Sequence, residues 1–405
     1  LSNQLNLGEL YPPKRGDEHR VANRSDFKKI EVGALIAGGG IAGSALFRYM
    51  ADSGLNPVLV NADRGSSWRN IGGGRTAFSL PELAEIAEHN HAIFKELQKI
   101  SNIDYKTTRY INLAHDESTF NALDASRAWS DAFMVDPKNF HKEISPYFST
   151  KSKRYLGALI TNDCWQATPG KVVDLIRNMG VSAGGRIVED CKVLEVMKEG
   201  STYSILVLTH DKKYVEFRTE IFVNALGAGA GKICEGLGIH AGLYPVRHQA
   251  FITRRLPMLG KNGDSLDMLI DRQEYKGFSA VYGQQLLHTG QIIGCASPRV
   301  DALRTDKNLI LNTKEFMEIV SEFFVDWVPE LAGVSIQATW SGYYTEPRYI
   351  VDPELGLFVG MRGHGFMLSQ YLAKIYVDKL MGRPVPEYFD QLKLNGPGLS
   401  EKAFK

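Results

Sequence analysis

Short apolar runs and longer amphipathic stretches alternate at the start of the chain. Residues 32–37 and 57–60 are apolar runs of strand length, and residues 44–53 between them carry apolar side chains at helical spacing. This pattern predicts a strand, a turn, a helix and a second strand in succession. Such a unit is typical of a parallel sheet that is covered by helices.

The rest of the chain contains further segments with the apolar pattern of helices and others with that of strands. Apolar residues at helical spacing predict helices over 81–100, near 172–179, near 316–324 and after position 365. Strands are predicted at 191–196, 277–283 and 291–295. The aromatic stripe near 316–324 is typical of a buried helix face, so we expect it to be core packing.

Glycines fill the turn between the first strand and the first helix. Gly38, Gly40 and Gly43 follow the pattern Gly-x-Gly-x-x-Gly. Gly38 permits the tight turn, Gly40 lets the backbone approach a pyrophosphate, and Gly43 lets helix and strand pack closely. The N-terminus of the predicted helix offers N–H donors and a partial positive charge to the phosphates, with Ile41 and Ala42 of the turn as further contacts. These features predict a dinucleotide site, against the alternative of a glycine-rich packing turn.

The end of the second strand is the position where an acid usually holds the ribose diol of the dinucleotide. Here this position is Asn61, followed by Ala62. An amide can donate to a diol and accept from it, so we expect Asn61 to bind the ribose with Ala62 beside it. An inward-turned Asp63 is the competing candidate.

The charges nearly cancel over the 405 residues, with 47 Lys and Arg against 46 Asp and Glu and a net charge of +1. No basic excess attracts a phosphate backbone, so nucleic-acid binding by bulk electrostatics is excluded. The 44% hydrophobic and 23% charged residues are typical of globular domains. The longest uncharged run, 32–47, is too short to span a membrane. These properties predict a cytoplasmic enzyme.

Cysteine and histidine spacing argues against a metal site. The four cysteines form no close pair, and we expect reduced, mostly buried thiols. His89 and His91 lie two residues apart on the predicted helix 81–100 and therefore point to different faces. Solvated helix surface is the preferred interpretation for this pair.

Further segments narrow the dinucleotide site to one kind of enzyme. They are 66–75, then 222–231 followed by 244–249, and finally 340–345 with 360–368. In this order and spacing the chain resembles the D-amino-acid oxidase superfamily of FAD-dependent amine oxidoreductases. It looks most similar to the branch of the sarcosine oxidase β-subunit and dye-linked proline dehydrogenase. The resemblance covers residues 29–382.

The resemblance implies a non-covalently bound FAD. Beyond the glycine turn, Asn61 and Ala62, the implied contacts are Arg69, Asn70, Gly73, Gly74, Arg75, Val193, Gly227, Gly363, His364, Gly365, Phe366 and Met367. Val193 corresponds to a valine whose backbone meets the adenine. The helix that begins near Gly365 would aim its N-terminus at the pyrimidine end of the isoalloxazine and stabilise the negative charge of the reduced ring. The alternative is a Gly-His-Gly loop that only turns the chain.

The domain division also follows from the resemblance. It implies a discontinuous FAD-binding domain of residues 29–106, 150–242 and 339–390. A substrate-binding domain of 107–149 and 243–338 would carry a mostly antiparallel sheet. Residues 1–28 would be an N-terminal arm on the surface or on a partner, and 391–405 a C-terminal tail. The expected fold is thus α/β (α+β two-domain), with a Rossmann-like domain around a central parallel sheet.

The implied reaction is oxidation of a C–N bond in an amino acid or N-substituted amino acid by hydride transfer to flavin, giving an imine that water hydrolyses. Relatives acting on primary amino acids carry an arginine at the position of Tyr344, whereas sarcosine-type relatives carry a tyrosine. Tyr344 is therefore our first candidate for the substrate pocket, with a purely structural ring as the alternative. Arg75, Tyr275 and His364 are further catalytic candidates. The other cations of this region, Arg247, Arg348 and Lys276, are interpreted as surface charges.

Three family positions differ in this chain. The covalent flavin-linking cysteine falls on Gly342, the lysine that binds the substrate carboxylate on Met367, and the lysine that assists oxygen reduction near Ile292. These differences favour a dehydrogenase that passes electrons to another carrier, or to a partner subunit in a homo- or hetero-oligomer, over an oxidase that uses oxygen. Two alternatives remain: a flavin 2-hydroxy-acid oxidase or dehydrogenase on the same fold, and a flavin-binding subunit without catalytic activity.

Overall fold

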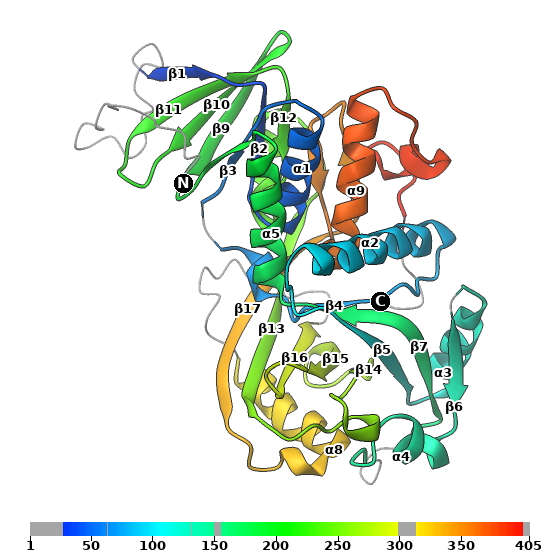
Figure 1. The fold of residues 1–405 in the computed structure, drawn as a ribbon. Coiled ribbons are helices and arrows are strands. Elements are labelled where there is room, and N and C mark those ends of the chain that lie inside the picture. Colours follow the sequence, from blue (N-terminus) through cyan, green and yellow to red (C-terminus); the bar gives the residue numbers. More distant parts are fainter. Residues whose placement is uncertain (1–26, 63, 130, 150–154, 299–312, 400–405) are drawn as a thin grey trace.

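The computed structural model describes residues 27–62, 64–129, 131–149, 155–298 and 313–399. In this part of the chain three β-sheets follow one another along the molecule (Figure 1). The first 26 residues of the expected N-terminal arm lie outside the described residues. Asp63, the competing candidate for the ribose, also lies outside them.

A six-stranded sheet forms the middle of the molecule. Across the sheet its strands are β18 (Ile350–Asp352), β19 (Leu357–Val359), β12 (Phe222–Asn224), β2 (Ala34–Ala37), β3 (Pro57–Val60) and β8 (Arg186–Val188). Neighbours from β19 to β8 are parallel, and β18 runs antiparallel at the edge. The prediction of a central parallel sheet is confirmed.

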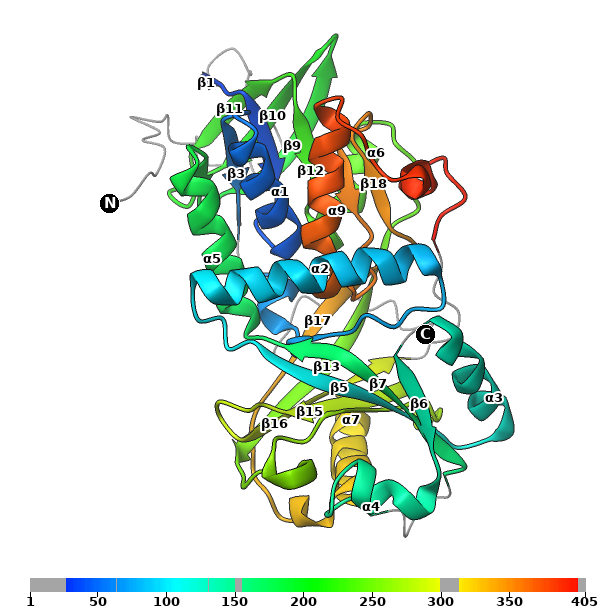
Figure 2. The same ribbon diagram turned by 45° about the vertical axis from the view of Figure 1, so that its right-hand side comes forward.

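Helices α1 (Ile41–Asp52), α2 (Pro81–Ile100), α5 (Pro169–Ser182) and α9 (Gly365–Leu380) pack beside this sheet and against one another (Figures 1 and 2). Their inward side chains, among them Leu46, Phe94 and Leu372, share one buried core. Helix α1 begins three residues before the predicted start, because the chain enters the helix directly after the extended residue Gly40. Helix α2 has the predicted bounds.

A four-stranded sheet packs against the central sheet. It consists of β1 (Lys28–Glu31), β11 (Tyr214–Thr219), β10 (Thr202–Leu208) and β9 (Lys192–Glu199). Leu35 and Val58 of the central sheet share a buried cluster with Val193 and Phe217 of this one. The short helix α6 (Ala230–Gly236) adds Ile233 to the same cluster.

The third sheet is large and mostly antiparallel. It contains β17 (Ile336–Glu346), β13 (Tyr244–Arg255), β16 (Gln291–Pro298), β15 (Phe278–Gln285), β14 (Met268–Asp271), β5 (Lys106–Ala114), β7 (Gly157–Gln166) and β4 (Gly73–Gly74), with β6 (Ala132–Val135) paired to β7. Strands β14 and β5 are parallel, and the other pairs are antiparallel. The expected antiparallel sheet is confirmed.

A second core lies between one face of this sheet and the elements α4 (Phe140–Glu143), α7 (Lys314–Ile319), α8 (Val325–Trp327) and the π-helical turn Val320–Phe324. The predicted aromatic stripe is buried there: the ring of Phe324 lies 4.8 Å from that of Phe251 on β13. Helix α3 (Glu117–Ala125) packs at the β5–β7 edge. The opposite face of the sheet is turned toward α2 (Figure 2).

The expectation that both α2 histidines lie on a solvated surface is wrong for His91. Its side chain is 1% exposed and stacks on Trp165 with ring centroids 4.4 Å apart. Its Nε2 shares a hydrogen bond of 2.8 Å with the Tyr105 hydroxyl. Residues two apart on a helix point about 200° apart, so His91 turns to the core while His89 is exposed.

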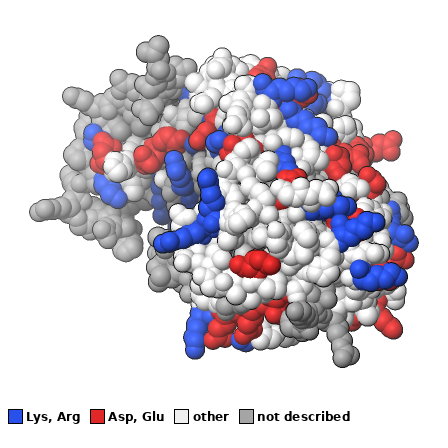
Figure 3. All heavy atoms as spheres, turned by 60° about the horizontal axis from the view of Figure 1, so that its bottom comes forward, with Lys and Arg blue, Asp and Glu red and all other residues white. Residues whose placement is uncertain are grey.

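Acidic and basic side chains are interspersed in small groups over the surface shown in Figure 3. All four cysteines are buried free thiols, as predicted. Within the described residues, no helix combines the length and the apolar character needed to cross a bilayer.

Candidate active site

The predicted phosphate site lies at the carboxyl ends of the central parallel strands. Gly38 has φ of +105°, and a Cβ there would lie 2.5 Å from the carbonyl oxygen of Ala225. A Cβ on Gly43 would lie 1.8 Å from the carbonyl oxygen of Gly38. Only glycine therefore fits at these two positions. The turn brings the N-terminus of α1 to the sheet edge, where the Ile41 N–H donates to Oγ of Ser67 at 2.8 Å.

The N-terminus of α9 lies beside that of α1. Helix α9 starts at Gly365, and its N-cap residue His364 provides no side-chain cap. A Cβ on Gly365 would lie 3.5 Å from Cγ2 of Ile41, the first residue of α1. Two helix N-termini, each with a partial positive charge, thus lie close enough for one elongated ligand to reach both.

Tyr344 on β17 lies against the loop before α9. Gly363 has φ of +79°, and a Cβ there would lie 2.1 Å from Cε2 of Tyr344. The Tyr344 hydroxyl shares a hydrogen bond of 2.9 Å with the Tyr282 hydroxyl, and the His248 ring stacks on Tyr344 with centroids 3.5 Å apart. Burial raises the pKa of both tyrosines, so both hydroxyls stay protonated at neutral pH.

Strand alternation directs a set of side chains of the large sheet toward the same region. On β14, Leu269 belongs to the core under the sheet, whereas Met268 and Ile270 cluster with Tyr110 and Tyr282 on the other face. Arg272 follows at the next position of that face. Its Nη1 donates to Oδ1 of Asn112 on the neighbouring strand β5 at 2.7 Å.

Guanidinium groups make the region around His364 electropositive. Desolvation, followed by the charges of Arg75, Arg362 and Arg272, holds the pKa of His364 well below its usual value. His364 is therefore neutral at physiological pH, and its Nδ1 bonds to the Tyr349 hydroxyl. Arg362 is paired with Glu346, with 2.8 Å between Nε and Oε2, and the buried Arg75 donates from Nη1 to the carbonyl oxygen of Ala77.

The predicted contacts of the adenosine half gather around the glycine turn. Oδ1 of Asn61 accepts from the Gly39 N–H at 3.2 Å, and the carbonyl oxygen of Asn61 accepts from the Cys191 N–H at 2.9 Å. Ala62 follows Asn61 in the chain, and Val193 lies two residues after Cys191. Gly227, with φ of +55°, follows Ala225 and Leu226, whose backbone lies against Gly38.

The remaining predicted contacts lie beside β17, in β4 and at the start of α9. Arg69 accepts at its carbonyl oxygen from Nε1 of Trp340 at 2.7 Å, and Asn70 accepts at Oδ1 from the Gly72 N–H. Gly73 and Gly74 form β4, and a Cβ on Gly74 would meet the Trp165 ring at 2.2 Å. Phe366 is buried against Phe94, and the Met367 N–H donates to the His364 carbonyl oxygen. Both residues therefore support the α9 start from behind.

The structure does not bring Tyr275 to this group. Tyr275 lies on the turn between β14 and β15, is 36% exposed, and packs its ring against Phe323 of the helical layer. Its neighbour Lys276 is paired with Glu318 and Glu322.

The interpretation of Arg247 as a surface charge is wrong, because Arg247 is buried and its Nε donates to Oγ of Ser341 at 2.9 Å. Arg348 is also structural: its Nη2 donates to two carbonyl oxygens of residues 393–396.

Two features test whether these residues fit a flavin dinucleotide. Glycines let the backbone of the α1 turn, and of the α9 loop where they flank His364, come close to a ligand. Three buried polar atoms on the described residues of the Tyr344 side have no hydrogen-bond partner: Nδ1 of His248, Oε1 of Gln284 and Nη2 of Arg362. Buried polar groups without partners are costly and are expected to be satisfied by a ligand or water. These residues fit FAD.

Comparison with known proteins agrees with this fit. The family model of FAD-dependent oxidoreductases called DAO matches residues 34–379. The chain belongs to the DAO family of FAD-dependent oxidoreductases. The predicted resemblance, the flavin and the oxidoreductase class are confirmed.

Solved structures share the fold of this DAO protein. L-proline dehydrogenase from P. horikoshii has a TM-score of 0.75 at 22% identity, covering 91% of this chain and 97% of that one. Glycine oxidase from Bacillus cereus has a TM-score of 0.71 at 19% identity, covering 94% and 100%. A curated relative, anaerobic glycerol-3-phosphate dehydrogenase subunit A1 of Haloferax volcanii, is 27% identical over 240 residues. That match spans 52% of this chain and 39% of the relative.

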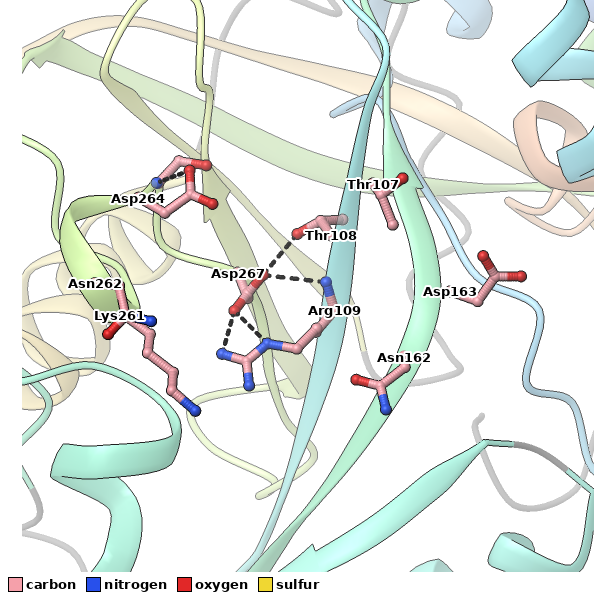
Figure 4. Close-up of a pocket in the computed structure, with 10 residues that line it drawn as sticks. Thr107, Thr108, Arg109, Asn162, Asp163, Lys261, Asn262, Asp264 and Asp267 are labelled. Carbon is pink, nitrogen blue, oxygen red and sulfur yellow. Dashed lines mark hydrogen bonds and ion pairs between the residues drawn. The ribbon is translucent and has the colours of Figure 1, made fainter.

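A cavity of about 410 Å³ lies between the first residues of β5, residues 162–163 of β7 and the segment 261–267 (Figure 4). Its polar groups bond to one another. Asp267 accepts from the Thr108 hydroxyl and from three N–H groups of Arg109, and Lys261 is paired with Glu143. We assign the DAO site to the Tyr344 region, where buried polar atoms lack partners.

His248 gives this region a pH-dependent stability. Burial lowers the pKa of His248 to about 3, against about 6.5 unfolded. The neutral form favours folding, so this stability is present above about pH 6.5 and is lost as the pH falls toward 3. Between pH 7 and pH 5 the free energy of unfolding should drop by about 2 kcal/mol through this group.

The variant His248→Phe keeps a ring against Tyr344 but does not titrate. In urea titrations of the holoprotein we expect the wild type to lose about 2 kcal/mol more than His248→Phe between the two pH values. An equal loss in both proteins would show that His248 is not the group responsible.

Proposed function

We propose that this DAO protein oxidises the C–N bond of an amino acid or N-substituted amino acid. The observation that carries the proposal is Arg272, which follows Met268 and Ile270 on the face that clusters with Tyr282, whose hydroxyl bonds to that of Tyr344. The charges of Arg75, Arg272 and Arg362 all act on His364. A planar guanidinium matches a carboxylate with two parallel hydrogen bonds. Such a site favours a substrate that carries a carboxylate beside the reacting carbon.

The proposed roles follow from position and charge. Arg272 binds the substrate carboxylate and thereby fixes the distance of the reacting carbon from the α9 start. Tyr344 and Tyr282, whose hydroxyls stay protonated, donate hydrogen bonds and orient the substrate. Met268 and Ile270 line the same face and exclude water. Arg75 and the N-terminus of α9 hold positive charge where electrons accumulate.

The bound flavin supplies the two-electron oxidation of the C–N bond. The electron acceptor that follows is proposed to be a carrier other than oxygen. Ile292 stands near the position of the lysine that assists oxygen reduction in relatives. The absence of a lysine at this position supports a dehydrogenase.

The test is anaerobic mixing of the yellow holoprotein with single substrates while the flavin absorbance is followed. The panel contains glycine, N-methylglycine, both proline enantiomers, lactate and glycerol 3-phosphate. We expect an amino acid or N-methyl amino acid to bleach the flavin, and a dye to restore the colour faster than air.

Other outcomes of this experiment overturn parts of the proposal. Bleaching by lactate or glycerol 3-phosphate alone would assign C–O oxidation, which the glycerol-3-phosphate dehydrogenase relative makes a specific competitor. A flavin that no compound bleaches would favour the subunit without catalytic activity. Faster reoxidation in air than with the dye would identify an oxidase.

A further inference from the structure

The carboxyl edge of the central sheet carries an acid that the sequence analysis did not consider. Strands β2, β3 and β8 are parallel neighbours, so the glycine turn after β2, Asn61 after β3 and Glu189 after β8 lie along the same edge. Ligands of such sheets bind outside the carboxyl ends of the strands. Glu189 is therefore adjacent to the expected adenosine site.

The side chain of Asn61 is committed to protein partners. Its Oδ1 accepts from the Gly39 N–H, and its Nδ2 donates to Oε2 of Glu189 at 2.7 Å. The amide thus links the glycine turn to the carboxylate. A ribose diol presents two O–H donors, and the Asn61 oxygen already accepts one bond, so Asn61 alone is a poor partner for the diol.

The carboxylate of Glu189 is held in place and still accessible. Oε1 of Glu189 accepts from Nη1 of Arg177 at 2.7 Å, and the side chain is 36% exposed. Arg177 also donates from Nη2 to the carbonyl oxygen of Gly39 and from Nε to Oγ of Ser44. An ionised carboxylate has about four lone-pair sites, so each oxygen of Glu189 can accept one further hydrogen bond.

We propose that Glu189 supplies the carboxylate that binds the adenosine ribose diol of FAD in this chain, in place of an acid at position 61. Asn61 and Arg177 are positioning residues that hold the Glu189 carboxylate beside the glycine turn. The proposal concerns the adenosine half of the cofactor and does not depend on which substrate the protein oxidises.

The test measures flavin binding to the full chain after removal of FAD, by quenching of flavin fluorescence. Glu189→Gln should weaken FAD binding about tenfold, the effect of losing one charge-assisted hydrogen bond. Binding of FMN, which has no adenosine, should not change. The matched control is Asp190→Asn, which removes the neighbouring exposed charge at a residue with φ of +56°, a conformation that asparagine tolerates. This control should bind FAD as the wild type does.

A competition experiment tests whether the Glu189 carboxylate recognises the ribose diol. With the wild type, ADP should displace FAD several-fold better than 2′-deoxy-ADP, and Glu189→Gln should abolish this difference. Adding Asn61→Asp to Glu189→Gln should restore it, because a carboxylate returns to the same edge. The proposal is overturned if Glu189→Gln weakens FAD and FMN equally or leaves FAD binding unchanged, or if the difference between the two nucleotides persists in Glu189→Gln.

Discussion

Gly43→Ala should yield a protein that is purified largely without flavin. The added methyl group would lie 1.8 Å from the carbonyl oxygen of Gly38, a distance that no side-chain movement can relieve because both groups are backbone-bound. The start of α1 must then move away from the glycine turn. An overpacked contact of this kind costs about 3 kcal/mol, which is roughly a hundredfold in FAD affinity if the strain is released by distorting the phosphate site.

The measurement is the ratio of flavin to protein after purification, together with the dissociation constant for added FAD. The matched control is Gly236→Ala, at the end of the short helix α6, where an added Cβ meets no atom within 4 Å among the described residues. It should retain flavin as the wild type does. Stoichiometric, tightly bound FAD in Gly43→Ala would contradict the assignment of the phosphates to this turn.

Elements defined by local patterns could be predicted from the sequence. Strand β3, with its four buried apolar residues, and helix α2, with Pro81 at its start, occur at the predicted residues. In both, hydrophobic period and turn residues agree and determine the element without distant partners. The glycine turn was found for the same reason, since its spacing lies within six residues.

Side chains that meet across the large sheet could not be predicted in this way. Arg272 lies near His364 only because β14 pairs with β5 and its alternate face is turned toward α9. The residue type alone does not distinguish Arg272 from the exposed residues that follow it. Strand alternation was the available signal, because Met268, Ile270 and Arg272 occupy every second position.

Burial of polar residues was the other source of error. His91 and Arg247 were expected at the surface because their types are mostly exposed or only partly buried. In both cases specific partners offset the cost of burying a polar side chain. His91 contacts Tyr105 and Trp165, and Arg247 contacts Ser341. Such partners are distant in sequence, so the compensation becomes visible only in the folded chain.

Arg272→Gln should lower kcat/KM for a carboxylate-bearing substrate about a hundredfold. Under the proposed function the guanidinium forms a charge-assisted, forked hydrogen bond to the carboxylate in a partly desolvated site. Truncating one partner of such a pair costs about 3 kcal/mol, and this cost appears in kcat/KM because the substrate is misplaced as well as weakly bound. The measurement is the rate of anaerobic flavin reduction over a range of substrate concentrations.

The methyl ester of the same substrate separates carboxylate binding from general damage. The ester has no anion for Arg272 to bind, so its reduction rate should be nearly equal in wild type and Arg272→Gln. Arg272→Lys keeps the positive charge but lacks the forked donor geometry of arginine. Its kcat/KM for the free acid should therefore lie between the values of the wild type and Arg272→Gln. Arg127→Gln removes one positive charge from a surface residue paired with Asp124 and should behave as the wild type. If Arg272→Gln lowers kcat/KM by the same factor for the free acid and for the methyl ester, Arg272 shapes the site without binding the carboxylate. Arg75 would then be the next candidate for the residue that binds it.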